Sequence, residues 1–357
     1  MKILILANND VGLYKFRRDL ILELLKDHSV YIALPYGKMV DLLISDGCCF
    51  IDTPIDRRGI NPINDLKLLF DYYSIIRNEK PDLVITYTIK PNIYGGLICR
   101  FLNTTYALNI TGLGTAFEND NWLKKLVVTL YKIASKNAKV VFFENSENER
   151  IFLDNRIIKT YQAKLLNGAG VNLDYFCYQK YPNNDVFRFL FVGRVMKEKG
   201  IDELFASMKR LIQDYNCCLD VVGRFEEDYS ELIEKYQKEG WLNYYGFQDD
   251  VRPFIKQCDC FVLPSYHEGM ANTNLECAAS GRPIITSNIS GCKEAVINNK
   301  SGLLCRPKDS KDLYEIMKKM ICFSKTERSE MGKTGNQHMK DVFDKQMVVK
   351  ETITYLL

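Results

Sequence analysis

The chain has 357 residues, of which 46% are hydrophobic and 26% are charged. That balance is typical of a folded, soluble protein, and the length indicates two domains. The 48 Lys and Arg residues against 45 Asp and Glu leave a net charge of +3, too small to indicate a nucleic-acid-binding protein.

The first half of the chain alternates short apolar runs with segments of helical periodicity. Continuous apolar runs are typical of buried parallel strands, and we expect strands at 3–7, 30–34, 50–54, 83–87, 106–110 and 139–143. Helices are expected between them at 16–26, 38–45, 62–77, 92–101 and 122–135. This alternation predicts an α/β, doubly wound Rossmann-like domain over residues 1–170.

A second series of the same kind follows. Residues 163–171 predict a strand that enters a Gly-rich turn, and the polar stretch 179–185 is the best linker candidate. Strands are then expected at 187–192, 218–222, 243–245, 260–263 and 283–286. Helices are expected at 201–215, 229–239, 251–257, 273–280, 311–323 and 327–357. We predict a second Rossmann-like domain over 171–339, with the helix at about 340–357 packing back on the first.

Two such domains would place the carboxyl ends of both sheets toward a central cleft, where ligands of open α/β sheets bind. The charge divides unevenly between the two halves. Residues 1–180 carry 23 Lys and Arg against 19 Asp and Glu, and the remainder carries 25 against 26. The first half is therefore the one expected to meet an anionic surface.

Several classes of protein are disfavoured by what the sequence lacks. No G-x4-G-K-[ST] motif occurs, which argues against a P-loop NTPase. The residues that follow the first strand, 8–12, do not match G-x-G-x-x-G, which argues against an ordinary dehydrogenase. No Asp-x-Asp occurs, and the twelve cysteines show no zinc-type spacing, so we expect no metal and no disulfide framework. No apolar run approaches the ~18 residues of a membrane span, and the apolar start is too short for a signal peptide.

Two cations follow the first strand of the second domain. Residues 191–200 read Phe-Val-Gly-Arg-Val-Met-Lys-Glu-Lys-Gly, which places Arg194 and Lys199 in the loop at the strand's carboxyl end, before a helix. Arg supplies a fork and Lys a point charge, and a helix N-terminus also favours anions. The loop is therefore a candidate clamp for a diphosphate; the alternative is a solvated basic loop.

Two carboxylates lie eight residues apart in 263–276, which read Leu-Pro-Ser-Tyr-His-Glu-Gly-Met-Ala-Asn-Thr-Asn-Leu-Glu. Glu268 precedes a glycine in the loop after a strand. Thr273 or Asn274 is expected to cap the next helix, which would put Glu276 in its first turn. Both carboxylates can accept hydrogen bonds from sugar hydroxyls. For Glu276 the alternative role is stabilisation of the helix dipole.

Together with 246–250 and 281–285, these two motifs resemble retaining glycosyltransferase family 4 over nearly the whole chain. The resemblance implies the metal-independent GT-B fold, with no cofactor and a nucleotide diphosphate sugar as donor. It implies catalytic roles for Arg194, Lys199 and Glu268. The donor-binding set that it implies adds Gly12, Asn272, Thr273, Asn274, Leu275 and Glu276.

The acceptor side is less fully specified. Many family members have a His near the position of Thr111, which this chain lacks; His267 could be proposed instead, but a spacer role fits it better. Residues 56–62, 81–96 and 109–114 resemble bacterial enzymes that build polyprenyl-diphosphate-linked oligosaccharides. Arg57, Arg58 and Lys90 follow strand ends and are expected to bind the acceptor diphosphate. A solvated loop is the alternative for the two arginines.

A membrane surface is a further expected partner. In 122–136, Lys125, Lys132 and Lys136 share one helical stripe beside Trp122 and Leu126, as in basic amphipathic helices that lie on anionic bilayers. An ordinary domain helix with a solvated lysine face is the alternative. We therefore expect a cytoplasmic protein that associates with the inner face of the cytoplasmic membrane.

The sequence thus predicts a retaining glycosyltransferase. It would move a hexose or N-acetylhexosamine, from a UDP-linked donor, to a lipid-linked saccharide in bacterial surface polysaccharide or glycan biosynthesis. Two alternatives stay open: a nucleotide-sugar epimerase of the same fold, and a non-catalytic nucleotide-sugar sensor.

Overall fold

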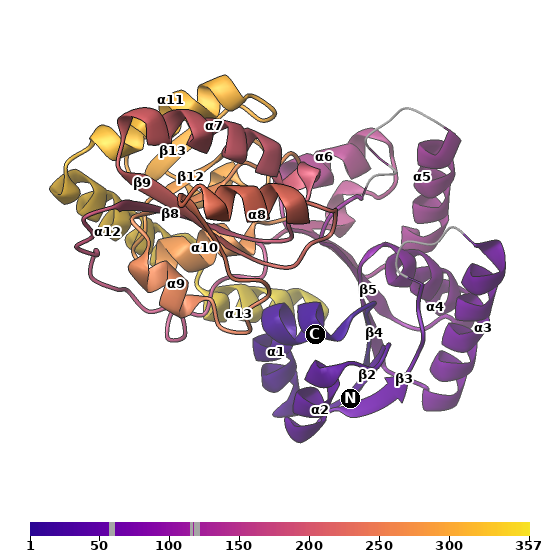
Figure 1. Cartoon of the computed structure of the whole chain (residues 1–357). Coiled ribbons are helices and arrows are strands. Elements are labelled where there is room, and N and C mark those ends of the chain that lie inside the picture. The colour runs from indigo at the N-terminus through magenta and orange to yellow at the C-terminus, as the bar shows by residue number, and fades with distance from the viewer. Residues whose placement is uncertain (57–60, 115–116, 118–121) are drawn as a thin grey trace. The chain divides into compact units, whose positions relative to one another are not determined.

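The computed structural model describes residues 1–56, 61–114, 117 and 122–357. The chain forms two compact units (Figure 1). Unit 1 consists of Met1–Ala169 together with Gln346–Leu357, and unit 2 of Gly170–Lys345. The predicted α/β class with two Rossmann-like sheets is confirmed, since both sheets are entirely parallel within the described chain.

Unit 1 is built on a parallel sheet with the order β3-β2-β1-β4-β5-β6-β7 in its described part. The strands are β1 (Lys2–Leu6), β2 (Ser29–Leu34), β3 (Cys49–Asp52), β4 (Leu83–Tyr87), β5 (Tyr106–Ile110), β6 (Val140–Phe143) and β7 (Ala163–Leu165). The order reverses between β1 and β4, and the carboxyl ends of the strands at such a reversal are where open α/β sheets bind ligands.

Helices cover both faces of this sheet. They are α1 (Asp10–Leu25), α2 (Lys38–Ser45), α3 (Pro62–Glu79), a π-helical turn (Pro91–Gly95), α4 (Gly96–Leu102), α5 (Trp122–Ser135), α6 (Ser146–Asp154) and a 3₁₀ turn (Thr160–Gln162). Successive strand side chains point to opposite faces. Ile3 and Ile5 accordingly pack with α1, α2 and the C-terminal helix, whereas Leu4 and Leu6 pack with α3, α4 and α5.

Unit 2 repeats the architecture with a parallel sheet in the order β10-β9-β8-β11-β12-β13. Its strands are β8 (Phe187–Val192), β9 (Cys217–Val222), β10 (Leu242–Tyr244), β11 (Cys260–Leu263), β12 (Ile284–Ser287) and β13 (Gly302–Cys305). Its helices are α7 (Ile201–Asp214), α8 (Ser230–Lys238), α9 (Arg252–Gln257), α10 (Asn272–Ala279), α11 (Ser310–Cys322) and α12 (Lys325–Val342), with 3₁₀ turns at Lys197–Lys199 and Lys293–Ala295. Here the order reverses between β8 and β11.

The C-terminal segment corrects the prediction of one helix over 327–357. The structure has two, α12 and α13 (Lys345–Leu356), because the chain leaves the helical path at Phe343 and Asp344. There the N–H of Val171 donates to the carbonyl of Phe343 at 2.8 Å, and the N–H of Lys345 donates back to Val171 at 3.1 Å. The chain returns to unit 1 at Gln346, six residues later than expected.

The polar stretch 179–185 is not a linker, because it lies inside unit 2 and is tied down there. The buried guanidinium of Arg282 donates to the carbonyl of Gln179 at 3.1 Å, and the Tyr181 hydroxyl donates to the carbonyl of Asp259 at 3.0 Å. Composition marks a segment as polar, but hydrogen bonding to distant residues decides whether it is loose.

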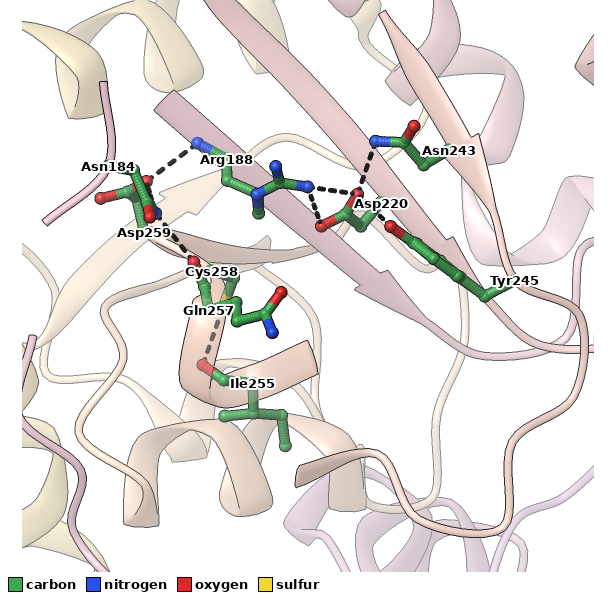
Figure 2. A network of polar contacts seen from close by, with 9 residues as sticks. All are labelled: Asn184, Arg188, Asp220, Asn243, Tyr245, Ile255, Gln257, Cys258 and Asp259. Atoms are coloured by element: carbon green, nitrogen blue, oxygen red, sulfur yellow. Dashed lines mark hydrogen bonds and ion pairs between the residues drawn. The ribbon is translucent and has the colours of Figure 1, made fainter. Parts of the chain in front are cut away.

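Figure 2 shows how two buried carboxylates, Asp220 on β9 and Asp259 just before β11, form hydrogen bonds with Arg188 on β8. Asp220 on β9 accepts two hydrogen bonds from Arg188 on β8 at 2.9 Å and one from Asn243 at 2.9 Å. Asp259 accepts from the Asn184 amide at 2.8 Å and from the N–H of Arg188 at 2.9 Å. Buried carboxylates with this many donors are satisfied, which points to a structural role for the network.

Three further element predictions need correction. The strand β13 and the helix α6 were not expected, although the Asn145 side chain caps α6 by accepting from the N–H of Asn148 at 2.9 Å. The helix α1 starts at Asp10, six residues before the expected 16, because Asn9 caps it. In both helices a single Asn, which is also a common turn residue, sets the start.

Candidate active site

The loops after β8 and β11 meet at the point where the strand order of unit 2 reverses. Neighbouring strands whose connections run in opposite directions open a crevice at their carboxyl ends. The loop after β8 carries Arg194 and Lys199, and the loop after β11 carries Ser265 and Glu268. Topology therefore brings the two predicted motifs to one edge of the sheet.

Lys199 and Glu268 form an ion pair between these two loops, although they lie 69 residues apart in sequence. Their side chains are 17% and 12% exposed, so the pair is shielded from water but reachable. The hydroxyl of Ser265, which is fully buried, donates to the same carboxylate oxygen at 2.8 Å. An ammonium group has three donors, so Lys199 can hold Glu268 and still donate to a ligand.

Close backbone contacts hold the two loops together. Gly200 has φ +71°, and a Cβ at this position would lie 2.1 Å from the carbonyl oxygen of Pro264. The N–H of Tyr266 donates to the carbonyl of Glu198 at 2.8 Å. The Tyr266 hydroxyl reaches Glu203 in the first turn of α7 at 2.8 Å. Only a glycine allows this approach, which fixes Lys199 next to the loop of Glu268.

Arg194 lies at the same edge but makes a different contact. Its side chain is 41% exposed, and its guanidinium forms an ion pair of 3.7 Å with Glu226 in the loop after β9. It is thus a partly solvated cation beside the shielded Lys199. The structure brings Lys199 and Glu268 together and places Arg194 at the solvent side of the loop.

The start of α10 differs from the sequence prediction. The helix begins at Asn272 after Ala271, and neither Thr273 nor Asn274 caps it. Glu276 is consequently the fifth helical residue and lies in the second turn. The N–H of Asn272 donates to the carbonyl of Met270 at 3.0 Å, so a tight turn takes the place of the side-chain cap.

Two buried amide oxygens stand out at this helix start. Asn274 is fully buried and donates to the Thr286 hydroxyl at 3.1 Å, but its Oδ1 has no partner among the described residues. The buried Oδ1 of Asn272 likewise has no partner within the described chain. Buried acceptors are normally satisfied by protein groups, ordered water or a ligand, so these two oxygens are available to a donor from outside the described residues. Leu275 lies in the hydrophobic core, so only its backbone could reach a ligand.

Cys292 is fully buried, and its carbonyl oxygen accepts a hydrogen bond from the Asn274 amide at 3.5 Å. Burial, and then the charge of Glu268, raises the pKa of the Cys292 thiol well above its ordinary value. The thiol therefore stays protonated and acts as a small apolar side chain, not as a nucleophile. Neither Ser265 nor Cys292 was singled out from sequence. For Ser265 a signal existed, because it lies two residues after the strand in the motif that contains Glu268.

The residues predicted in unit 1 are placed as follows. Gly12 lies in the first turn of α1, where its N–H donates to the Asn9 side chain at 2.6 Å; the expected loop position is wrong because α1 starts earlier. Lys90, two residues after the left-handed Thr88 (φ +74°), forms an ion pair of 2.6 Å with Asp65 on α3. Arg57 and Arg58 lie outside the described residues.

Within the described ranges, no group of three or more His, Cys, Asp and Glu side chains is arranged to hold a metal ion. Among the same residues, no helix combines the length and the apolar character needed to cross a bilayer. His267 is exposed, whereas the neighbouring Glu268 side chain is shielded, as expected for consecutive residues of an extended segment.

Two family models match the chain, one on each unit. The model described as "Glycosyl transferase 4-like" matches residues 2–145, and "Glycosyl transferases group 1" matches residues 179–338. The second match contains the whole Lys199–Glu268 site.

Two curated relatives and one solved structure are similar to the chain. The N,N'-diacetylbacillosaminyl-diphospho-undecaprenol alpha-1,3-N-acetylgalactosaminyltransferase of Campylobacter jejuni is 28% identical over 334 residues, covering 88% of each chain. The Escherichia coli UDP-Gal:alpha-D-GlcNAc-diphosphoundecaprenol alpha-1,3-galactosyltransferase is 28% identical over 296 residues, covering 76% of this chain and 74% of the other. Anabaena HepE, solved with UDP and glucose, superposes with a TM-score of 0.82 at 16% identity, over 100% and 99% of the two chains.

Proposed function

Since the chain belongs to the family 4-like glycosyltransferases of the GT-B fold, we propose that it transfers a hexose or N-acetylhexosamine from a UDP-linked donor to a lipid-linked saccharide. The product would serve bacterial surface polysaccharide or glycan biosynthesis. The observation that carries this proposal is the shielded Lys199–Glu268 pair, seated on Ser265 where the strand order of unit 2 reverses.

On the donor side, Lys199 and Arg194 neutralise the diphosphate. As the bond between sugar and diphosphate breaks, negative charge grows on the leaving oxygen, and a preorganised ammonium stabilises it. Glu268 accepts a hydrogen bond from a sugar hydroxyl, and Glu276 accepts one from the ribose. Backbone N–H groups at Asn272 and Thr273 meet the phosphates at the start of α10. The unpartnered oxygens of Asn272 and Asn274 accept from further hydroxyls of the donor.

We propose that the reaction retains the anomeric configuration and needs no metal or cofactor. Both relatives are named for an alpha-1,3 linkage, and UDP-activated galactose is itself alpha-linked. The acceptor hydroxyl attacks the anomeric carbon from the face that the diphosphate leaves. The new C–O bond forms as the old one breaks, and the departing phosphate oxygen takes the hydroxyl proton.

The acceptor is a saccharide on a polyprenyl diphosphate. Both relatives are named for acceptors on diphospho-undecaprenol. In this chain Lys90, together with Arg57 and Arg58, supplies cations for the acceptor diphosphate. These three follow strand ends of unit 1, whereas the donor residues all lie in unit 2 except Gly12.

Peripheral association with the inner face of the cytoplasmic membrane fits the surface of α5. Trp122 is 72% exposed, and Leu126 and Ile133 are exposed one and three turns further along the same stripe. Lys125, Lys132 and Lys136 are exposed beside this stripe. Apolar side chains flanked by lysines are the pattern of a helix that lies on an anionic bilayer.

The test is turnover by the purified protein on a panel of UDP-sugars, with and without short-chain polyprenyl-diphosphate saccharides. A transferase releases free UDP only when the acceptor is present, and the product anomer is read by NMR. Conversion of the donor without acceptor would identify an epimerase. Donor binding without turnover on any acceptor would identify a sensor. An inverted product would contradict the retaining mechanism.

A further inference from the structure

Three neighbouring helices of unit 1, α3, α4 and α5, form one layer over the face of the sheet that carries Leu4 and Leu6 (Figure 1). The helix α4 contacts both α3 and α5. Their buried residues, such as Leu68, Ile98 and Val127, share one core with the sheet. The exposed residues of the three helices therefore form one outer surface, which we call the α3–α5 face.

The apolar part of this face is separate from the core. Ile63, Leu66 and Phe70 on α3 are 77%, 56% and 61% exposed, and their spacing of three and four residues puts them on one stripe. Phe101 on α4 is 75% exposed. None of the four belongs to the core of unit 1 or to the partly buried side chains packed against it. Apolar side chains that gather in water on one face indicate a binding partner.

The charged residues exposed on this face are all basic. They are Lys67 and Arg77 on α3 and Lys125 and Lys132 on α5, and no Asp or Glu is exposed among the described residues of the three helices. The helices α1 and α2, on the opposite face of the same sheet, expose acidic as well as basic residues. The partner of the α3–α5 face is therefore expected to be both apolar and anionic.

We propose that the α3–α5 face lies on an anionic bilayer, with Ile63, Leu66, Phe70 and Phe101 entering the interface beside the apolar stripe of α5. The inference deepens the proposed function, on which it rests for the lipid-linked acceptor, and it makes α3 and α4 part of the membrane contact. The apolar side chains reach the acyl boundary, while the basic side chains extend to the phosphate groups of the lipids.

The competing occupant is a second copy of the chain. A two-fold symmetric interface places the same patch on both subunits. The exposed lysines and arginine of one copy would then approach those of the other, without an exposed acidic residue on these helices to pair with them. An anionic bilayer instead supplies a negative charge for each cation.

Co-sedimentation of the full chain with vesicles of phosphatidylglycerol and phosphatidylcholine tests the proposal. Leu66→Gln/Phe70→Gln should weaken vesicle binding several-fold, because two apolar side chains no longer leave water. The matched control is Leu42→Gln/Ile44→Gln, which changes two side chains that are 42% and 45% exposed on α2. This control should bind vesicles as the wild type does.

Charge and the contribution of α5 are tested in the same assay. Lys67→Glu should weaken binding several-fold, whereas Lys38→Glu, the same charge change at an exposed position of α2, should have little effect. Combined with Trp122→Ser/Leu126→Ser, the loss caused by the α3 double variant should multiply, since both helices enter one bilayer at separate places.

Insertion of α3 has its own measurement. The chain has two tryptophans, Trp122 and the buried Trp241. In a Trp122→Phe background, Phe70→Trp places a new indole on the α3 stripe. Vesicles with brominated acyl chains should quench its fluorescence, because the side chain reaches the acyl boundary.

Unchanged vesicle binding by Leu66→Gln/Phe70→Gln would overturn the proposal, and so would an equal loss in the α2 control or the absence of quenching. Thermal melting checks that each variant is folded. If light scattering finds a wild-type dimer that the α3 variant converts to a monomer with full vesicle binding, the face joins two copies instead. Failure of the proposed function is separate, because it appears as absent UDP release on a short, water-soluble acceptor.

Discussion

The carboxyl edge of unit 2 and the α3–α5 face of unit 1 differ in the polarity and the exposure of their side chains. At the edge of unit 2 a shielded ion pair, Lys199–Glu268, rests on a buried hydroxyl and is fixed by a glycine contact. The α3–α5 face instead exposes Phe70, Phe101 and Trp122. Its helices α4 and α5 contain Arg100 and three lysines and no Asp or Glu.

This difference teaches how each kind of site becomes visible. A site for a charged, hydrogen-bonding ligand is built from residue types that are uncommon in apolar surroundings, so sequence spacing reveals it. A site for lipid is built from the same side chains as a core, so periodicity alone assigns it to the core. Only the packing of neighbouring elements shows which apolar stripe stays uncovered.

The largest effect is expected at the edge of unit 2. Lys199→Ala should lower turnover by roughly two or more orders of magnitude, the scale for losing one preorganised charge stabiliser. Lys197→Ala is the matched control, because this exposed lysine lies two residues away in the same turn. The measurement is the steady-state turnover rate of each variant and of the wild type on one donor and one acceptor. Near-normal turnover of an Arg194→Ala/Lys199→Ala double variant would remove both residues from the site.

The next largest effect is expected on stability, at Gly200, which contacts the Pro264 carbonyl and so joins the loops after β8 and β11. Gly200→Ala adds a Cβ 2.1 Å from the Pro264 carbonyl oxygen, whereas Gly240→Ala, with φ +85°, meets nothing among the described residues within 4 Å. Both variants carry the strain of a left-handed alanine. Gly200→Ala should therefore destabilise the protein by about 2 kcal/mol more, the scale of overpacking. Chemical denaturation measures the difference; equal free energies of unfolding would contradict the tight loop contact.

On the acceptor side, charge reversal at Arg57 and Arg58 should act on one substrate only. Loss of charge-assisted hydrogen bonds to the diphosphate should raise the acceptor KM by about tenfold or more and leave the donor KM nearly unchanged. Kinetics with each substrate varied in turn separate the two. An equal rise in the donor KM, or no change in either KM, would show that these arginines do not bind the acceptor and would favour the alternative, a solvated loop.

A smaller effect is expected on α5. Trp122→Ser together with Leu126→Ser should reduce the fraction of enzyme bound to phosphatidylglycerol vesicles several-fold, because two exposed apolar side chains no longer enter the interface. Turnover on a short, water-soluble acceptor should stay at the wild-type level. Co-sedimentation gives the bound fraction, with phosphatidylcholine vesicles as the comparison. Vesicle binding as strong as that of the wild type would identify α5 as an ordinary solvated helix.

The smallest expected effect is that of metal removal. If Lys199 and Arg194 stabilise the leaving diphosphate as proposed, excess EDTA should leave turnover essentially unchanged. The measurement is the rate before and after chelation, followed by addition of Mg²⁺ or Mn²⁺. Activity that vanishes with chelator and returns with either ion would show that the leaving group is stabilised by metal and not by Lys199 and Arg194 alone.

Much of the local structure could be predicted from the sequence. The strands β4, β5, β8 and β11 and the helices α2 and α5 have the expected ends, because apolar runs and helical periodicity are properties of consecutive residues. The prediction of a glycosyltransferase is confirmed by the two family matches. The motifs that carry it are short and lie next to strand ends, so they too are local.

The sequence by itself thus determined the α/β alternation, the family and the residue types of the two motifs that contain Lys199 and Glu268. The tertiary structure alone decided that Lys199 contacts Glu268, that Ser265 supports the pair, and that Val171 ends α12. It also decided which apolar stripe of α3 remains in water. The reason is physical: periodicity depends on neighbours along the chain, whereas pairing, burial and exposure depend on residues that topology brings together from far apart.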